Sequence, residues 1–391
     1  MTKDPLSGIA RISSLLAKGG YSARLHAYSA IDRYLGFHDM PILWLETNAD
    51  IAALARLIEN LRFPGVDLAD GAADTPEGTC YFRCLEKNDQ RTFTFPLLSF
   101  YCDLQRGHFG DPLGVYPVLK NLREKRSPAY NHDEFSLGKV QSEAGRYRVI
   151  MDAALLLARY GFDRGQISSE LGETLENYPP EPPPSQETQR AFLNCLLVSP
   201  QPDEGLAFLK SSGFLKELWP ELSCLDEVDH SKEYHPEGNV WDHTLETFRY
   251  RKALASGAFD LRLSLGLLLH DVGKPISASF GSRRFDGHAE LGARTAKHFL
   301  KRLEYEGALA DDIFFLVKNH MLPAALKRLP LIKTREIMTS PLFPVLMELY
   351  RCDESSSFKV LDNYYENSAA YQTYLRNQRN PYRRNPRCSL A

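Results

Sequence analysis

The stretch "LSLGLLLHDVGKP", residues 263–275, constrains the fold of this chain more than any other. Its apolar run is long enough for a buried helix, and Gly273 and Pro275 are residues that end helices. The adjacent His270 and Asp271 therefore stand at the end of a buried helix. Ionisable groups beside apolar surface are costly to bury unless they are paired or bind a metal ion. The stretch fits either a helix that ends in a polar corner or part of a metal site.

The composition indicates a globular protein with more than one domain. The chain has 391 residues, of which 43% are hydrophobic, and this suffices for two or three packed cores. Lys and Arg number 47 against 50 Asp and Glu, so nucleic-acid binding would need a local patch. We find no secretory leader and no apolar run of about 18 residues, and we expect a cytoplasmic protein without membrane contact. The seven cysteines are odd in number and scattered, which is not typical of a disulfide framework.

Two kinds of pattern divide the chain. In the first third, "MPILWLET" and "RTFTFPLLSFYCDL" predict strands, and "DIAALARLIENLRF" predicts a helix between them. From about residue 140 the pattern is almost wholly helical, and the proline-rich stretch 178–188 is expected to join helices. We therefore predict an α+β fold. Its parts are a small α/β head at 1–135, an all-α neck at 136–230, an all-α domain at 231–375 and a basic tail at 376–391.

Four more histidines and aspartates lie at predicted helix ends. They are His243 in "WDHTLETF", His288 in "GHAELGA", His320 in "LVKNHM" and Asp353 in "YRCDESSS". Taken singly, each histidine is more often an ordinary core or surface residue. Taken together with His270 and Asp271, they form an ordered set of imidazoles and carboxylates. Such groups suit divalent metals, among which Mn, Fe, Ni, Co, Mg and Zn are candidates.

The residues next to His270 indicate how such a site would act on a phosphate. A carboxylate directly after a ligating histidine can bridge two ions, which lower the pKa of a bound water and polarise a phosphate. Asp271 and Lys274 are therefore the candidate catalytic residues. Lys274 is placed either to contact a phosphate oxygen or to form a salt bridge with Asp271. Arg283 and Arg284 are candidate substrate contacts, or they serve only the solubility of a loop.

Over most of its length the chain resembles bacterial tRNA nucleotidyltransferases, the CCA-adding enzymes and their poly(A) polymerase relatives. "YHPEGNVWDHTLETF", "LLLHDVGKP", "FDGHAELGA", "LVKNHM" and "YRCDESSS" are similar to the HD phosphohydrolase domain that is fused to these enzymes. The resemblance implies a phosphodiesterase or phosphatase that acts on a nucleotide or RNA-end phosphoester, with tRNA as a candidate partner. It implies one or two divalent ions held by His243, His270, Asp271, His288, His320 and Asp353.

The first third resembles the nucleotidyltransferase head of that family, but its active-site residues are replaced. The family's "GGxVRD" loop corresponds to "AYSAID", where Tyr28 replaces a glycine and Ile31 replaces the arginine. The metal-binding "DxD" corresponds to Ile42-Leu43-Trp44. Without those carboxylates, the ions that align a triphosphate have no ligands. A shifted alignment would leave Asp39 or Asp50 as a lone acid.

Two further family motifs are altered in the same way. Thr92 replaces the aspartate of the family's "RDFT". In "GRYRVIMDAALLLARYGF", Arg148 and Arg159 are retained, whereas Asp152 and Leu155 stand where the resemblance implies substrate-binding arginines. We therefore expect a head that has lost catalysis.

The main expectation is a metal-dependent HD phosphohydrolase, and two alternatives stay open. One is a non-catalytic tRNA-binding or RNA-binding module that uses the head, the neck and the tail. In the tail, Arg376, Arg379, Arg383, Arg384 and Arg387 are interleaved with Tyr374 and Tyr382. This pattern is typical of phosphate and base contacts and equally of a solvated tail. The other alternative is a divergent tRNA nucleotidyltransferase or poly(A) polymerase.

Overall fold

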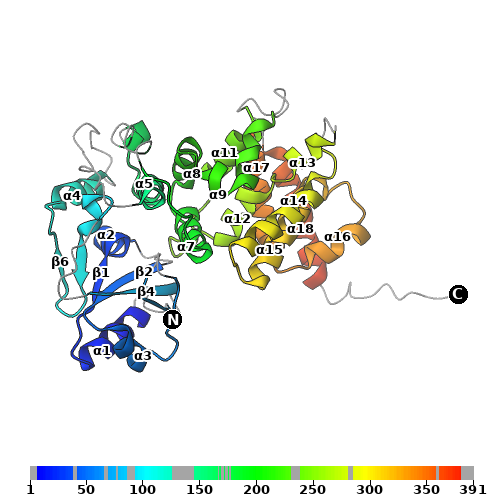
Figure 1. Cartoon of the computed structure of the whole chain (residues 1–391). Helices are drawn as coiled ribbons and strands as arrows, with labels where there is room; N and C mark the ends of the chain where they lie inside the picture. Colours follow the sequence, from blue (N-terminus) through cyan, green and yellow to red (C-terminus); the bar gives the residue numbers. More distant parts are fainter. Residues whose placement is uncertain are drawn as a thin grey trace. The chain divides into compact units, whose positions relative to one another are not determined.

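The computed structural model describes most of the chain. The described residues are 7–37, 42–65, 69–75, 78–85, 93–125, 145–165, 167–168, 171, 175, 178–229, 238–280, 285–357 and 361–379. They belong to two compact units, Met1–Leu218 with Ala253–Phe259 and Trp219–Lys252 with Asp260–Ala391 (Figure 1). Asp39, Thr92, Arg283, Arg284 and residues 380–391 lie outside the described part. The division into head, neck, HD domain and tail stays a prediction.

The first unit contains a mixed six-stranded sheet with the order β3-β4-β2-β1-β5-β6. The strands are β1 (Arg24–His26), β2 (Ile42–Thr47), β3 (Gly71–Thr75), β4 (Gly78–Cys84), β5 (Tyr101–Asp103) and β6 (His108–Gly110). Strands β2 and β4 are parallel, and the other neighbours are antiparallel. Trp44 of β2 lies opposite Tyr81 of β4. The strand predicted in "MPILWLET" is confirmed as β2.

Two predicted elements of this unit are shorter than expected. In "RTFTFPLLSFYCDL", Pro96–Ser99 forms the 3-10 helix η1, and only Tyr101–Asp103 forms a strand. Proline has no N–H for a strand ladder, and its fixed φ suits the first position of a turn. The helix predicted in "DIAALARLIENLRF" is limited to α3 (Ile51–Leu57). Asp50 caps it by accepting a hydrogen bond from the backbone N–H of Ala53 at 2.7 Å.

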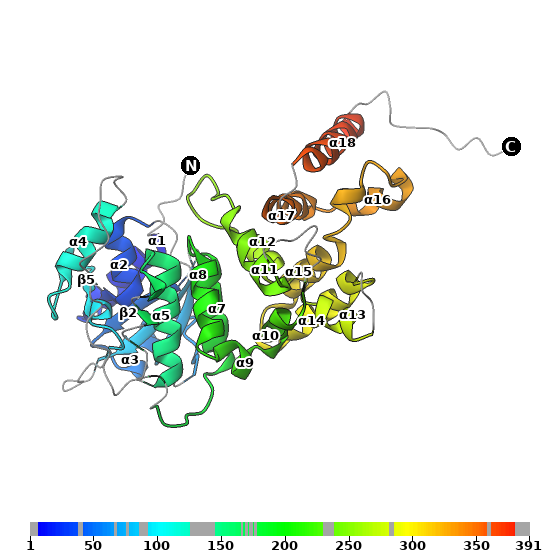
Figure 2. The same ribbon diagram turned by 90° about the horizontal axis from the view of Figure 1, so that it is seen from above.

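Helices cover the sheet and continue beyond it in the first unit. Besides α3 they are α1 (Ser7–Lys18), α2 (Ala27–Leu35), α4 (Tyr116–Lys125), α5 (Arg146–Tyr160), α7 (Gln186–Leu197), α8 (Pro202–Ser211) and α9 (Phe214–Leu218). Helix α2 contacts β1, β2 and β5. Helix α5 is buried along 149–160 and packs against α7 and α8 (Figure 2). Gly205 of α8 allows this approach, because a Cβ there would lie 2.7 Å from the carbonyl oxygen of Ala154.

The elements that the structure describes in the second unit are helices, as predicted. Its elements are α10 (Pro220–Ser223), η2 (Cys224–Glu227), α11 (Val240–Arg249), α12 (Leu261–Leu269), α13 (Lys274–Ser279), α14 (His288–Arg302), α15 (Gly307–Asn319), η3 (Pro323–Ala325), α16 (Leu331–Met338), α17 (Phe343–Ser356) and α18 (Asp362–Arg379). None of the helices in the described part has the length and hydrophobicity needed to cross a membrane. The α+β fold class expected from the sequence is confirmed.

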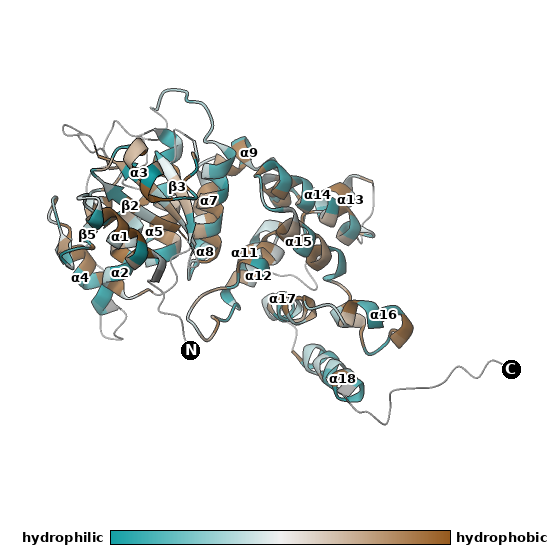
Figure 3. Ribbon diagram, turned by 90° about the horizontal axis from the view of Figure 1, so that it is seen from below, coloured by the Kyte–Doolittle hydropathy of each residue, from teal (hydrophilic) through white to brown (hydrophobic). Residues whose placement is uncertain are grey.

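Helix α12 is the core of the second unit. Residues 263–269 are all buried, and α12 contacts α11, α15 and α17. Gly266 allows α17 to approach, because a Cβ there would lie 2.9 Å from Cδ1 of Leu349. Helix α14 is amphipathic, with buried residues spaced by three and four positions such as Ala293, Ala296 and Leu300, and Figure 3 colours it in alternating teal and brown. The polar ends of these helices meet at one place.

Candidate metal centre

Six side chains from the ends of five helices meet in the second unit. His243 lies in the first turns of α11, His270 caps the C-terminus of α12 and precedes Asp271, His288 begins α14, His320 caps the C-terminus of α15, and Asp353 lies in the last turn of α17. These are the six residues that the sequence predicts as metal ligands. Because α12 contacts α11, α15 and α17, and α14 contacts α15, the five helix ends converge.

The six residues form two groups of three. The first group is His243, His270 and Asp353, and the second group is Asp271, His288 and His320. Within each group, the ligand atoms lie within 4.8 Å of one another. The five members other than Asp353 are buried. Such spacing is what a single ion needs from three side chains.

Asp271 lies between the two groups. Its Oδ2 atom is 3.2 Å from Nε2 of His270 and 3.8 Å from Nε2 of His243. Its Oδ1 atom is 3.5 Å from Nε2 of His288 and 3.8 Å from Nε2 of His320. The two oxygens of one carboxylate thus face different groups, which is the arrangement of a bridging ligand.

Three of the histidines have the same backbone contact. Nδ1 of His270, His288 and His320 lies 2.8, 2.8 and 2.7 Å from the carbonyl oxygens of Leu267, Phe285 and Val317, each three residues earlier. A carbonyl oxygen only accepts hydrogen bonds, so each Nδ1 donates. Burial lowers the pKa of His288, and it lowers the pKa of His320 to about 4. Near neutral pH both rings are therefore uncharged, and each Nε2 presents a lone pair.

The Nε2 atoms of the histidines face the centre of the site. Nε2 of His288 lies 3.1 Å from Nε2 of His320. Nε2 of His270, which is also buried, faces Oδ2 of Asp271 at 3.2 Å. Facing lone pairs repel each other unless a cation stands between them, so the donor set fits divalent metal ions of the kind that bind imidazole and carboxylate.

The two carboxylates are ionised and ready to act as ligands. Burial opposes ionisation, but His270 and Lys274 hold the pKa of Asp271 well below its usual value. Burial is likewise outweighed at Asp353, where the adjacent His243, with Nε2 3.0 Å from Oδ1, and His270 lower the pKa. Both acids are therefore ionised near neutral pH and bring negative charge to the site.

Gly273 brings the turn after Asp271 against the start of α14. A Cβ at this position would lie 2.1 Å from the carbonyl oxygen of His288 and 2.4 Å from the backbone nitrogen of Gly292. Both neighbours are backbone atoms and have little room to move. Only glycine allows this contact, which sets Asp271 beside His288. The sequence suggested this glycine as a helix end and gave no sign of its contact with α14.

Lys274 contacts Asp271 directly. Its Nζ atom lies 2.6 Å from Oδ2 of Asp271. Of the two roles expected for this lysine, the structure therefore contains the salt bridge, and the phosphate contact stays a prediction. Arg283 and Arg284, the other expected substrate contacts, lie outside the described residues.

Ser356 is a site residue that the sequence reasoning missed. Its Oγ atom lies 3.2 Å from Nδ1 of His243, so it takes the place that a backbone carbonyl has at the other three histidines. Its hydroxyl also donates to the carbonyl oxygen of Asp353 at 2.7 Å. The position three residues after Asp353 on the same predicted helix was the available signal.

In the first unit, Tyr28 binds Asp152. These are the residues predicted to replace a glycine and an arginine of the family motifs. The hydroxyl of Tyr28 donates to Oδ1 of Asp152 at 2.9 Å. Oδ2 of the same carboxylate accepts from the hydroxyl of Thr94 at 2.6 Å and from Nε of Arg148 at 2.9 Å. Asp152 is thus engaged by three side chains of the protein itself.

Arg159, the second of the two retained arginines, also has a structural partner. Arg159 donates through Nε to both carboxylate oxygens of Asp32, at 2.8 and 2.9 Å, and the hydroxyl of Tyr160 donates to the same group at 2.9 Å. All three residues are buried. The aspartate of "AYSAID" therefore holds α2 against α5.

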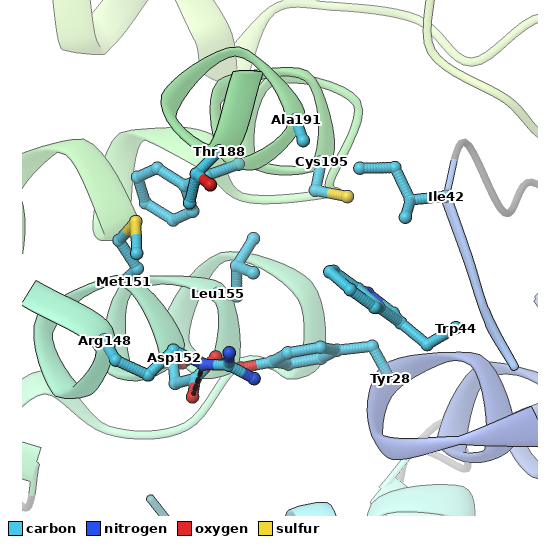
Figure 4. A pocket seen from close by; sticks show the side chains of 11 residues that line it. Tyr28, Ile42, Trp44, Arg148, Met151, Asp152, Leu155, Thr188, Ala191 and Cys195 are labelled. Carbon is cyan, nitrogen blue, oxygen red and sulfur yellow. Dashed lines mark hydrogen bonds and ion pairs between the residues drawn. The ribbon is translucent and has the colours of Figure 1, made fainter. Parts of the chain in front are cut away.

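A pocket is lined by Ile42 and Trp44, the residues predicted to replace the family's metal-binding carboxylates. It has an empty volume of about 430 Å³ and is lined by Tyr28, Ile42, Trp44, Arg148, Met151, Asp152, Leu155, Thr188, Ala191, Phe192 and Cys195 (Figure 4). The Trp44 ring stacks on Tyr81 with 5.1 Å between the centroids. Among the described residues, the groups able to hold a metal ion are the two in the second unit, and none includes a residue of this pocket. Asp50, one of the two lone acids considered, caps α3.

Comparison with known proteins finds a family match for the region that contains the six predicted ligands. Residues 240–363 match the HD domain family. The chain is 33% identical over 200 residues to the CC-adding tRNA nucleotidyltransferase of Thermus thermophilus, which covers 48% of this chain and 45% of that protein. It is 33% identical over 220 residues to the multifunctional CCA protein of Halorhodospira halophila, covering 55% of this chain and 49% of that protein. The chain thus spans about half the length of the curated relatives it matches.

One solved structure aligns with nearly the whole chain. It is a tRNA nucleotidyltransferase complexed with a primer tRNA and an incoming ATP analogue, and it aligns with 94% of this chain and 99% of its own. Its sequence identity is 14% and the TM-score is 0.49. The resemblance predicted from the sequence is confirmed by the domain match and the sequence relatives: residues 240–363 match the HD domain family, and about half of the chain is similar in sequence to tRNA nucleotidyltransferases.

Proposed function

We propose that the chain is a metal-dependent phosphohydrolase whose HD centre cleaves a nucleotide or RNA-end phosphoester. The observation that carries the proposal is the convergence of four Nε2 atoms on the two oxygens of Asp271. When bound, one or two divalent ions would supply a water of lowered pKa and polarise the phosphate. The candidate ions are Mn, Fe, Ni, Co, Mg and Zn, and the rate of phosphoester hydrolysis with each ion ranks them.

The protein's own residues have separate parts in this proposal. Asp271 holds the two groups in register, and the Nδ1 contacts to backbone carbonyls fix His270, His288 and His320 with Nε2 toward the centre. Lys274 brings a buried positive charge within reach of the same space. We propose that it turns from Asp271 to a phosphate oxygen when substrate binds, since an ammonium group is a common phosphate ligand.

The test is turnover of model phosphoesters by the purified chain. We expect hydrolysis of bis-p-nitrophenyl phosphate or of 2′,3′-cyclic nucleotides in the presence of Mn²⁺ or Ni²⁺, and loss of it in His270→Ala and Asp271→Ala. His298→Ala is the matched control, because His298 lies on α14 as His288 does but is exposed. No turnover by the wild-type chain with any of these ions and esters would contradict the proposal.

The names of the relatives favour a different function. They are tRNA nucleotidyltransferases, and this supports the expected alternative of a divergent nucleotidyltransferase better than it supports a hydrolase. Against it stand the sequence motif, in which Ile42 and Trp44 correspond to the family's carboxylates, and the contacts of Asp152, which is engaged by Tyr28, Thr94 and Arg148. Incorporation of labelled CTP or ATP into tRNA ends distinguishes the two, and we expect none.

Binding of tRNA is compatible with either activity and has its own test. We propose a tRNA end as partner, because the relatives carry tRNA in their names. Gel-shift titration with tRNA at two salt concentrations measures it, and deletion of residues 376–391 shows whether the arginine-rich tail contributes. A cytoplasmic location is proposed on the same grounds.

A further inference from the structure

His243 differs from the other histidines of the centre in what holds its ring. Nδ1 of His270, His288 and His320 faces a carbonyl oxygen of the preceding helical turn or loop. Nδ1 of His243 faces the hydroxyl of Ser356. Ser356 is the last residue of α17. A hydroxyl can donate as well as accept, so the proton position on His243 depends on what this hydroxyl does.

We propose that Ser356 is a positioning residue, which keeps the proton of His243 on Nδ1 so that the lone pair of Nε2 can bind a metal ion of the first group. The inference rests on the metal centre of the proposed function. The hydroxyl of Ser356 has one proton, which it donates to the carbonyl oxygen of Asp353 at 2.7 Å. At 3.2 Å from His243, its oxygen is therefore the acceptor and Nδ1 is the donor.

Asp353 competes with Ser356 for the proton of the ring. Its Oδ1 atom lies 3.0 Å from Nε2 of His243, and a carboxylate is a strong acceptor. If the proton moved to Nε2, it would occupy the space that a metal ion needs between His243 and Asp353. Ser356 opposes this, because only the Nδ1-protonated ring satisfies its oxygen.

Both contacts of Ser356 go to members of the first group. One is the ring of His243 and the other is the backbone of Asp353. The serine is buried, with 5% of its surface exposed, as is His243 with 1%, so bulk water has little access to replace the hydroxyl. Loss of the hydroxyl should therefore weaken the first group and leave Asp271, His288 and His320 able to bind. A residue that only supported the fold would affect both groups together.

The chain offers a matched control at the next position. Ser357 is 6% exposed, and its hydroxyl donates to the carbonyl oxygen of Glu354 at 2.9 Å, in the same three-residue spacing as Ser356 and Asp353. Zn²⁺ binding to Ser356→Ala, Ser357→Ala and the wild-type chain is measured by competition with a chromophoric chelator. We expect one of two Zn²⁺ ions to bind about 10–100-fold more weakly in Ser356→Ala, which is the usual effect of removing a group that orients a ligand. In Ser357→Ala both affinities should match the wild type, and Ser356→Thr, which keeps a hydroxyl, should recover most of the loss.

Equal Zn²⁺ affinities in Ser356→Ala and Ser357→Ala would overturn the inference and leave the proposed function standing. A wild-type chain that binds no Zn²⁺ would overturn both. The nitrogen-15 spectrum of the Zn²⁺-loaded wild-type chain tests the proton position without any substitution. We expect the four ligand histidines to carry the proton on Nδ1 and the metal on Nε2, and a proton on Nε2 of His243 would contradict the inference.

Discussion

Nε2 of His288 lies 3.1 Å from Nε2 of His320, while Nδ1 of each ring donates to a backbone carbonyl. Two lone pairs therefore face each other in a buried space, where repulsion is poorly screened. A bound cation removes this repulsion, and the folded protein is stabilised by whatever binds there. This relationship leads directly to the first prediction.

Metal ions should raise the melting temperature of the wild-type chain. Ligand at about 1,000 times its Kd stabilises a folded protein by about 4 kcal/mol when the unfolded chain does not bind it. Thermal melts with EDTA and with excess Zn²⁺ or Mn²⁺ measure the effect, and His320→Ala should lose a large part of it. His298→Ala, on an exposed position of α14, should behave as the wild type. Identical melts with EDTA and with metal would contradict the prediction.

The metal-free protein should lose stability in mild acid because of His320. Burial lowers the pKa of this histidine to about 4, whereas in the unfolded chain it is about 6.5. Between these values the unfolded chain binds more protons at this position than the folded protein, so the free energy of unfolding falls as the pH falls. Taken alone, the group accounts for a loss on the order of 3 kcal/mol once the pH is below both values.

Urea unfolding in EDTA at pH values above, within and below this window measures the slope. His320→Gln should show a flatter dependence on pH, even if its stability at neutral pH is lower. His298→Gln should keep the wild-type slope. A slope of the same size in His320→Gln would assign the acid sensitivity to other groups.

Gly273→Ala should disrupt the centre from outside the ligand set. The new Cβ would lie 2.1 Å from the carbonyl oxygen of His288, so α14 or the turn after Asp271 has to move. We expect a loss of about 1–3 kcal/mol in stability, as for other overpacked sites, together with weaker metal binding. Gly307→Ala at the start of α15 is the control, because a Cβ there meets nothing within 4 Å. Normal metal binding by Gly273→Ala would show that the contact does not position His288.

Replacement of Lys274 should separate metal affinity from turnover. The ammonium group lies 2.6 Å from Oδ2 of Asp271 and repels a metal ion that uses the same oxygen. Lys274→Met should therefore bind metal more tightly but hydrolyse phosphoesters more slowly, and Lys274→Arg should lie closer to the wild type. Chelator competition and steady-state assays measure the two quantities. Tighter binding with unchanged turnover would remove the lysine from the substrate site.

Asp32 should matter for the stability of the head and have no effect on the metal centre. Asp32→Asn leaves the buried guanidinium of Arg159 without its charge partner, and this typically costs about 3–5 kcal/mol. Asp311→Asn, which breaks an exposed ion pair with Lys297, should cost less than about 1 kcal/mol. Urea unfolding measures both, and neither variant should lose metal. A mild effect of Asp32→Asn would contradict the structural role.

Much of the second unit could be predicted from the sequence because the patterns there are local. The apolar run before His270 predicts a buried helix, and the positions of His243, His288 and His320 relative to helix ends follow from the 3.6-residue period and from nearby Gly and Pro. The likeness to known HD domains supplied the order of the ligands. Helix ends that carry ionisable groups must then meet if those groups are to be buried together.

Contacts between distant backbone segments were beyond such reasoning. The sequence around Gly273 does not indicate that this glycine lies against His288. Ser356 is one of three consecutive serines, and the sequence does not distinguish it from its neighbours. In the head, "RTFTFPLLSFYCDL" has the composition of a strand, yet Pro96 starts a 3-10 turn. Tertiary packing decides such positions, and a single sequence does not display it.

Metal content of a matched set of variants tests the central claim most directly. Equilibrium dialysis against Zn²⁺ followed by elemental analysis counts the ions per chain in the wild type, His243→Ala, His320→Ala and Asp271→Ala. If Asp271 bridges the two groups, the wild type should bind two ions, His243→Ala and His320→Ala one each, and Asp271→Ala none that survives dialysis. A wild-type chain without bound Zn²⁺, or an Asp271→Ala variant that retains both ions, would contradict the bridged centre.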